Sequence, residues 1–303
     1  MIFSELKNLL RTMEANEAGL IANRDPEHLH RYRVSLRRTR SCIGQMKRSL
    51  PEDRIAKFKP EFAWLGSVTG PTRDLDVFLH DIKRYRNRLD EMSRSSLKPL
   101  LELIRSDKRR AHDRLVAQLD TQRYRSLVSA WRAFLDSPMD EGEAPEAGRP
   151  IAEVAADRIR SRYERMIRRG RRLDAMKATD RLHRLRIDGK KLRYLLEFFR
   201  GLFPEETVDP LIATLKRLQD HLGGFNDLLV QQIAVSRMVP RLEATGQTPA
   251  ATFVTVGRLL ENLARREHRM RRRFAGEFDR FNDEETCGRI ERLAPIPSTE
   301  VPA

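Results

Sequence analysis

Apolar residues along the chain recur at spacings of three and four positions, and alternating runs of β-branched residues are missing. This period is typical of amphipathic helices that pack in bundles, so it predicts an all-α fold. The first half should contain helices over residues 5–22, 27–49, 52–68, 72–93, 97–119 and 122–136. The second half should contain helices over residues 151–174, 180–202, 208–222, 225–243 and 250–282.

Two segments of the chain resemble each other in sequence. The segment HRYRVSLRRTRS begins at His30, and HRLRIDGKKLRY begins at His183, 153 positions later. At the same displacement Pro51 falls on Pro204, and RDLDV at residues 73–77 falls on NDLLV at residues 226–230. A match that keeps its register over this length indicates an internal duplication. We therefore predict two pseudo-symmetric helical bundles that pack against each other.

A polar segment separates the two halves. It covers residues 136–150, DSPMDEGEAPEAGRP, and holds three Pro, two Gly and five acidic residues. Such a composition breaks helices and offers no apolar face to bury. The predicted organisation is a first bundle over 1–135, an acidic linker over 136–150, a second bundle over 151–285 and a tail over 286–303 that is disordered at its end.

The chain of 303 residues has a formal net charge of +15, and 48 of its 59 basic residues are Arg. The planar guanidinium group matches phosphate oxygens, which favours a phosphate-rich partner, although a GC-rich genome would give the same bias. Cys42 and Cys287 form no CxxC pair, which excludes a disulfide framework and a zinc ribbon. No apolar run matches a membrane-spanning helix or a signal peptide, so we expect a cytoplasmic protein without a membrane partner.

The repeated segment combines an apolar seam with a cationic flank. The predicted buried seam consists of Leu29, Leu36, Ile43 and Leu50 with Tyr32, Thr39 and Met46, and in the second half of Leu182, Gly189, Leu196 and Phe203 with Leu185, Leu192 and Phe199. Beside each seam, four cationic residues at steps of three, four and three share one side of the helix. Stripe 1 is His30, Arg33, Arg37 and Arg40, and stripe 2 is His183, Arg186, Lys190 and Arg193. Because like charges at these spacings repel one another, we expect a polyanion to compensate them.

Asp74 and Asp227 hold equivalent positions in the repeat, and each follows a predicted helix start. A carboxylate there caps backbone N–H groups or orients a His or Arg of the stripe, and we favour this structural role over catalysis. The alternative explanation of the stripes is a solvated helix face, or a face that Asp74, Asp76 and Asp227 neutralise. The chain has no HExxH motif and no Cys/His cluster, so neither a metal nor a cofactor is expected.

The paired segments HRYRVSLRRTRS and HRLRIDGKKLRYLLEFF, followed by GPTRDLDV and LQDHLGGFNDLLV, resemble the CHAD domain, the conserved histidine α-helical domain. The resemblance implies two four-helix bundles around a basic cleft that binds inorganic polyphosphate, and association with polyphosphate granules. It also implies that stripes 1 and 2 face the cleft. Further lining residues from later helices are Arg109, Arg110, His112, Arg265, Arg266 and His268. Asn226 stands where the first half has Arg73, so the two walls are expected to differ.

These observations predict a non-catalytic module that binds polyphosphate, with polyphosphate granule proteins or a polyphosphate kinase as further partners. One alternative is weak, nonspecific nucleic-acid binding through the same basic surface, which the scarcity of aromatic residues for base stacking disfavours. The other is a metal-dependent phosphohydrolase built on His80-Asp81 and His112-Asp113, with His30 as an upstream ligand. Asp81 and Asp113 have no counterparts in the second half, and the chain lacks a P-loop, so we rank this alternative last.

Overall fold

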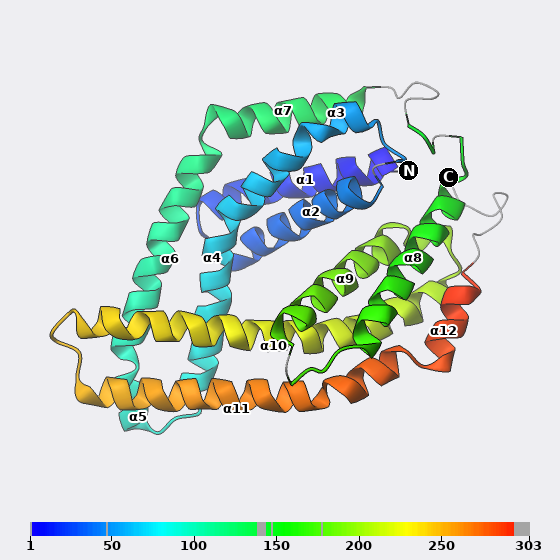
Figure 1. Cartoon of the computed structure of the whole chain (residues 1–303). Coiled ribbons are helices and arrows are strands. Elements are labelled where there is room, and N and C mark those ends of the chain that lie inside the picture. The colour runs from blue at the N-terminus through cyan, green and yellow to red at the C-terminus, as the bar shows by residue number, and fades with distance from the viewer. Residues whose placement is uncertain (1, 47, 138–143, 147, 177, 294–303) are drawn as a thin grey trace. The chain divides into compact units, whose positions relative to one another are not determined.

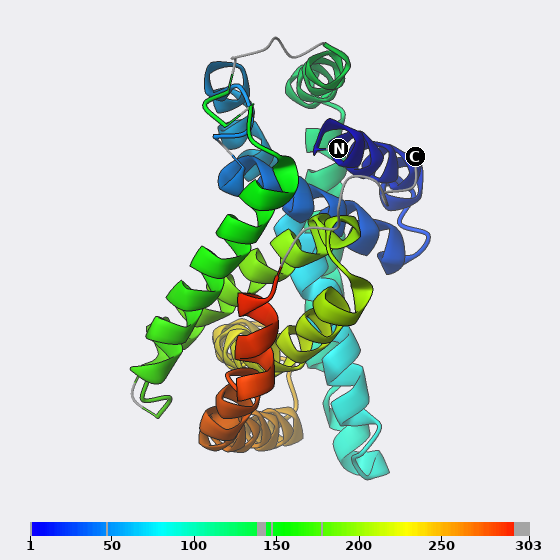
Figure 2. The ribbon, with the colours of Figure 1, turned by 90° about the vertical axis from the view of Figure 1, so that its right-hand side faces the viewer.

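The computed structural model describes residues 2–293 except 47, 138–143, 147 and 177. The chain is 85% helical, and the described residues contain no strand, which confirms the predicted all-α fold. Figures 1 and 2 show the helices from two directions.

The helices follow one another with short connections. The first half contains α1 (Ile2–Ile21), α2 (Pro26–Gln45), α3 (Glu52–Ala56), α4 (Phe58–Arg86), α5 (Glu91–Ser96), α6 (Lys98–Leu119) and α7 (Gln122–Asp136). The second half contains α8 (Ile151–Arg171), α9 (Thr179–Phe198), a 3-10 turn (Arg200–Leu202), α10 (Glu205–Glu243), α11 (Ala250–Phe281) and α12 (Glu284–Glu291).

The apolar seams of α2 and α9 lie in the core. All fourteen predicted seam residues are buried, which confirms this part of the prediction. Elsewhere in the first half, Trp131 of α7 packs against Phe62 of α4 and Phe134 of α7, with ring centroids 5.0 and 5.2 Å away. Burial of the seam fixes the rotation of each helix, so the cationic stripe beside it occupies a defined flank.

The described residues form two compact units. Unit 1 falls within residues 1–44, 51–140 and 231–263, and unit 2 within residues 45–50, 141–230 and 264–303. These units differ from the ranges predicted from the repeat, because one part of the second half packs with the first. Gln231 of α10 donates a hydrogen bond to Asp81 at 2.5 Å, and Arg241 forms a bidentate ion pair with Asp107 at 2.6 and 2.8 Å.

α4 and α10 are each one uninterrupted helix where the sequence predicted two. The predicted turn at residues 68–71 lies inside α4, and the predicted break near residue 223 lies inside α10. Asp74 and Asp227 therefore lie within helices, and the prediction that they follow helix starts is wrong. They do not cap a helix.

Side chains support the turn of α4 that precedes Pro71. Proline lacks a backbone N–H and normally interrupts a helix. Thr69 Oγ1 donates a hydrogen bond to the Leu65 carbonyl at 2.9 Å, and Arg33 Nη1 donates one to the Gly66 carbonyl at 3.1 Å. Pro71 leaves the Ser67 carbonyl without its helical donor, and these two bonds hold the carbonyls just before it, while α4 continues through the proline.

The acidic linker is anchored where the structure describes it. Ala144 is buried, and the Glu146 backbone N–H donates to the Arg48 carbonyl at 3.0 Å. The prediction that this segment has nothing to bury is wrong for these residues, while residues 138–143 and 147 lie outside the described part. The first residues of the predicted tail are helical, because α12 continues to residue 291, and Leu293 is buried. Residues 294–303 lie outside the described part.

Candidate functional site

Stripe 1 lies on α2 against the glycine-containing turn of α4. Arg33 Nη1 donates to the Gly66 carbonyl at 3.1 Å and to Thr69 Oγ1 at 2.7 Å. A Cβ built on Gly66 would come within 2.6 Å of Arg40 Nη1, and one on Gly70 within 3.6 Å of Arg33 Nη1. Gly66 therefore leaves room for the Arg40 guanidinium group, whereas a Cβ at position 70 would make only an ordinary contact with Arg33.

Stripe 1 carries an excess of positive charge. Burial lowers the pKa of His30, and the neighbouring Arg73 of α4 lowers it further. Burial also lowers the pKa of Arg33; Asp74 opposes this effect, and the surrounding arginines add to it. Among the described residues, none accepts a hydrogen bond from the buried Nε atoms of Arg33 and Arg37. An anion bound at the exposed ends of these side chains would relieve the repulsion between the cations.

Arg73 is a residue of this cluster that the predicted site left out. The sequence comparison named it only as the counterpart of Asn226. A signal for it was present, because Gly66, Gly70 and Arg73 follow one another at steps of four and three and so share one face of α4. The sequence does not show that this face lies against stripe 1, because that depends on how α2 and α4 pack.

Stripe 2 lies on α9 beside α10. His183 Nδ1 lies 2.9 Å from Asn226 Oδ1, and Arg186 Nη2 lies 3.9 Å from Asp227 Oδ1. The histidine of stripe 2 thus has a neutral amide for a neighbour where the histidine of stripe 1 has the cation Arg73. The sequence difference at these two positions therefore makes the two stripes electrostatically unequal.

The end of stripe 2 is partly neutralised by its own helix. Arg193 Nε lies 3.2 Å from Glu197 Oε1, and the Arg193 guanidinium lies 5.5 Å from the centroid of the Tyr194 ring. Lys190, one turn earlier, is half-buried. Both residues are half-buried, so solvent still screens this ion pair, and a ligand with several negative charges can compete with Glu197 for Arg193.

The carboxylates expected to neutralise the stripes have different partners. Asp76 pairs with Lys108 of α6 at 2.6 Å, away from the stripes. Asp74 acts on the pKa of Arg33, and Asp227 lies near Arg186 as described above. These contacts agree with a role of Asp74 and Asp227 in orienting arginines of the stripes, and that role stays a prediction.

Two of the three lining residues predicted on α6 make contacts inside unit 1. Arg110 donates to Asp107, and His112 Nε2 lies 3.1 Å from the Ile21 carbonyl at the end of α1. Arg109 is exposed. The Arg110 partner is a neighbour on the same helix, whereas the His112 partner lies far away in the sequence, which did not reveal it. The part of both residues in binding a ligand stays a prediction.

The predicted lining residues of α11 are exposed. They are Arg265, Arg266 and His268. Arg271, which the prediction left out, is instead half-buried: it donates to Thr179 Oγ1 at 2.7 Å and to the Ala175 carbonyl at 2.9 Å, and it lies 4.8 Å from the Phe225 ring centroid. Arg271 thereby fixes the start of α9, the helix that carries stripe 2. Arg271 lies in a run rich in arginine, and nothing in the sequence distinguishes it from the exposed arginines beside it.

The residues of the hydrolase alternative are separate in the structure. Asp81 accepts the hydrogen bond from Gln231, His112 contacts the end of α1, and His80 and Asp113 are exposed. Among the residues that the structure describes, no three His, Cys, Asp or Glu side chains gather as metal ligands. In the same part of the chain, no helix has the length and apolar character needed to cross a bilayer.

The fold and the stripes define an all-α protein with rows of cationic side chains beside the buried seams of two helices. The CHAD domain model matches residues 5–236, and the chain belongs to this family. It is similar to the crystal structure of the CHAD domain from the plant Ricinus communis, with a TM-score of 0.73 and 24% identity over 97% of this chain and 92% of that one. It is also similar to PptA from Streptomyces chartreusis, with a TM-score of 0.67 and 16% identity over 92% of this chain and 98% of that one. No curated protein sequence matches significantly.

Proposed function

We propose that the chain binds inorganic polyphosphate through stripes 1 and 2 and does not transform it. The observation that carries the proposal is the crowding of cations at stripe 1, where burial and neighbouring arginines lower the pKa values of His30 and Arg33. Perturbed groups of this kind mark functional sites when a ligand of opposite charge would relieve them. Membership of the CHAD domain family agrees with this function, which the sequence resemblance implied.

The spacing of the stripes suits a linear polyanion. Arg33 and Arg40 are seven residues apart on α2, so the helix rises about 10 Å between them and offers a cation about every 5 Å. A polyphosphate chain presents phosphate oxygens continuously along its length and has no other recognisable groups. Binding then rests on many ion contacts with release of counterions, so the affinity falls steeply with salt concentration.

The stripes offer little to a nucleic-acid base. Tyr32 and Tyr194, the tyrosines of the two stripe helices, are both buried, and the Tyr32 hydroxyl donates to the Tyr124 hydroxyl at 3.1 Å. Binding of single-stranded nucleic acid relies on exposed aromatic side chains on which bases stack. We therefore propose polyphosphate, and with it a location at polyphosphate granules, ahead of nonspecific nucleic-acid binding.

The test is a titration of the whole chain with long-chain polyphosphate at several salt concentrations, with duplex DNA as competitor. We expect log K to fall linearly with log salt concentration, with a slope of about −0.7 for each phosphate contact. Duplex DNA at equal phosphate concentration should leave most of the polyphosphate bound. Displacement of polyphosphate by an equal amount of DNA phosphate would instead assign the surface to general polyanion binding and overturn the proposal.

A further inference from the structure

One side of α8 carries four arginines that stripes 1 and 2 do not include. Arg158, Arg162, Arg165 and Arg169 follow one another at steps of four, three and four, so they share one face of the helix, which we call the α8 face. Asp188 of α9 lies against it, is buried with 3% of its surface exposed, and accepts a hydrogen bond from Arg169.

The α8 face has more positive charge than its buried carboxylate balances. Burial lowers the pKa of Arg162, the neighbouring Arg165 lowers it further, and Asp188 opposes both effects. Arg184 and Lys191 lie four residues before and three residues after Asp188, so α9 adds two cations on the same side. The face therefore resembles stripe 1 in combining partial burial with repulsion between cations.

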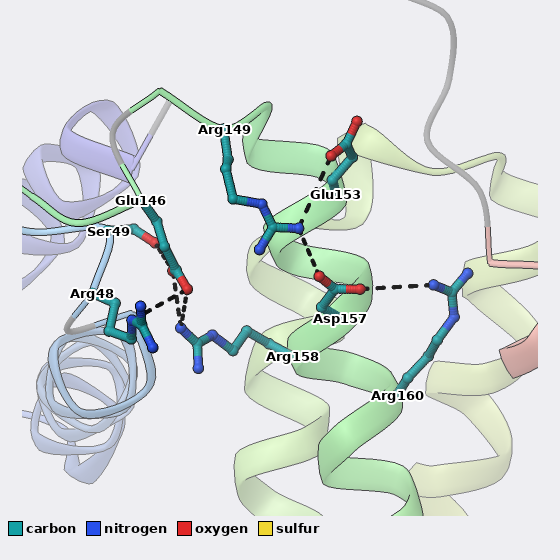
Figure 3. Close-up of polar contacts among 8 residues, drawn as sticks. All are labelled: Arg48, Ser49, Glu146, Arg149, Glu153, Asp157, Arg158 and Arg160. Carbon is teal, nitrogen blue, oxygen red and sulfur yellow. Dashed lines mark hydrogen bonds and ion pairs between the residues drawn. The ribbon is translucent and has the colours of Figure 1, made fainter.

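One end of the α8 face already holds an oxyanion of the protein itself. Figure 3 shows the carboxylate of Glu146 between Arg158 and the segment of Arg48 and Ser49. Arg158 Nη2 donates to both carboxylate oxygens at 2.9 Å, Ser49 Oγ donates at 3.0 Å, and Arg48 Nε lies 3.5 Å away. Burial raises the pKa of Glu146, but the hydrogen bonds from Arg158 and Ser49 outweigh it, so the net shift is downward. Guanidinium groups with a hydroxyl are also a donor set that suits phosphate oxygens.

The α8 face and stripe 2 lie on different sides of α9. Asp188 is two residues from both Arg186 and Lys190, and two residues correspond to about 200° of rotation on an α-helix. The contacts agree, since Asp188 meets Arg169 of α8 while Arg186 lies near Asp227 of α10. A ligand on the α8 face is thus bound at a separate surface of unit 2.

The first half of the chain has no equivalent face in sequence. At the displacement of the repeat, the four arginines of α8 fall on Glu5, Leu9, Thr12 and Asn16 of α1. Glu5 there forms an ion pair with Arg38 at 3.1 Å. The cationic character of the α8 face is therefore a feature of the second half alone and is not a by-product of the duplication.

We propose that the α8 face is a second phosphate-binding surface, which holds polyphosphate through Arg162, Arg165 and the outer side of Arg169, while Glu146 occupies the Arg158 end. The identity of this ligand rests on the proposed function. The partly uncompensated guanidinium groups and the built-in carboxylate carry the assignment of the surface itself.

The test compares two double variants of the whole chain that each remove two arginines from α8. Arg162→Gln/Arg165→Gln alters the α8 face, and Arg168→Gln/Arg171→Gln removes the same charge from other, exposed positions of the helix. For the first variant we expect the affinity for long-chain polyphosphate to fall about tenfold at about 0.15 M salt, and the salt slope to decrease by about 1.4. The control variant should stay within about twofold of the unaltered chain, because bulk charge is screened at this ionic strength.

Folding does not obscure this comparison. Removal of Arg162 and Arg165 relieves repulsion, so the melting temperature should stay the same or rise. Equal affinities of the two double variants would overturn the inference while leaving the proposed function intact. A loss of affinity for duplex DNA alone would also overturn it, and an unaltered chain that binds no polyphosphate would overturn the proposed function and this inference together.

Discussion

Arg33 and Arg37 are one helical turn apart in stripe 1, yet the structure predicts different consequences when each is replaced by Gln. Arg33 is fixed to α4 by hydrogen bonds to the Gly66 carbonyl and to Thr69 Oγ1, at 3.1 and 2.7 Å. Among the described residues, the Arg37 side chain pairs with no carboxylate, and its buried Nε has no acceptor. Arg33 therefore has a structural part that Arg37 lacks.

The magnitudes follow from these contacts. Hydrogen bonds from a charged donor contribute about 1.5–3 kcal/mol, and solvent screening of the half-buried Arg33 with relief of repulsion reduces the net loss in Arg33→Gln to about 1–2 kcal/mol. At about 2–4 °C per kcal/mol, the melting temperature should fall by about 2–8 °C. Arg37→Gln removes repulsion and no pairing, so its melting temperature should be unchanged or slightly higher. Its polyphosphate affinity should still fall about fourfold at about 0.15 M salt, the effect of one lost contact.

Differential scanning calorimetry measures the first effect, and a polyphosphate titration of each variant measures the second. Both variants lose one charge of the same stripe, so each serves as the control for the other. If Arg37→Gln melts as early as Arg33→Gln and binds polyphosphate like the unaltered chain, stripe 1 is an internal network of packing contacts. That result would refute the reasoning.

Three further predictions concern single positions. Because the pKa of His30 is lowered and a bound phosphate favours the imidazolium form, polyphosphate affinity should rise as the pH falls from about 7.5 to about 5.5. Titrations across this range should show a smaller rise for His30→Gln than for the exposed control His80→Gln, and equal profiles would contradict the assignment. Glu146→Gln frees its arginine partners of a negative charge, so polyphosphate affinity should increase about fourfold, and a decrease measured by titration would count against the α8 face. Asn226→Arg places at stripe 2 the cation that Arg73 supplies at stripe 1, so polyphosphate affinity should increase about fourfold, and an unchanged affinity in the titration would show that position 226 takes no part in binding.

The sequence was sufficient for the parts of the fold that depend on periodicity. Leu36 and Leu192 lie at the centre of seven-residue apolar patterns, and both are buried as predicted. The same periodicity places the stripes beside the seams, because a helix has a fixed rotation per residue. These features need no knowledge of which other helix lies nearby.

The features that the sequence could not predict depend on tertiary partners. Pro71 reads as a helix end in the sequence, yet α4 continues through it and Arg33 of α2 packs against the preceding turn. Gln231 belongs by sequence to the second repeat, yet its side chain binds Asp81, and nothing in the local pattern of α10 indicates this partner. The contact of His112 with the end of α1 was hidden in the same way, since helix periodicity gives the direction of a side chain and not the identity of its neighbour.

The α8 face was overlooked for a related reason. Arginine is so frequent in this chain that one more run of it carries no signal. What distinguishes Arg162 from exposed arginines is its partial burial and the charge of the buried Asp188 on the next helix, and both arise only when α8 and α9 are packed together.

The most direct test of the central claim is a polyphosphate titration of Arg37→Gln/Arg73→Gln beside the matched variant Arg84→Gln/Arg88→Gln, which removes two exposed arginines away from stripe 1. We predict that the stripe variant binds long-chain polyphosphate about tenfold more weakly at about 0.15 M salt, with a salt slope smaller by about 1.4, while the matched variant keeps the affinity of the unaltered chain. Equal affinities and equal slopes for the two variants would contradict the account, because charge in general, and not stripe 1, would then hold the ligand.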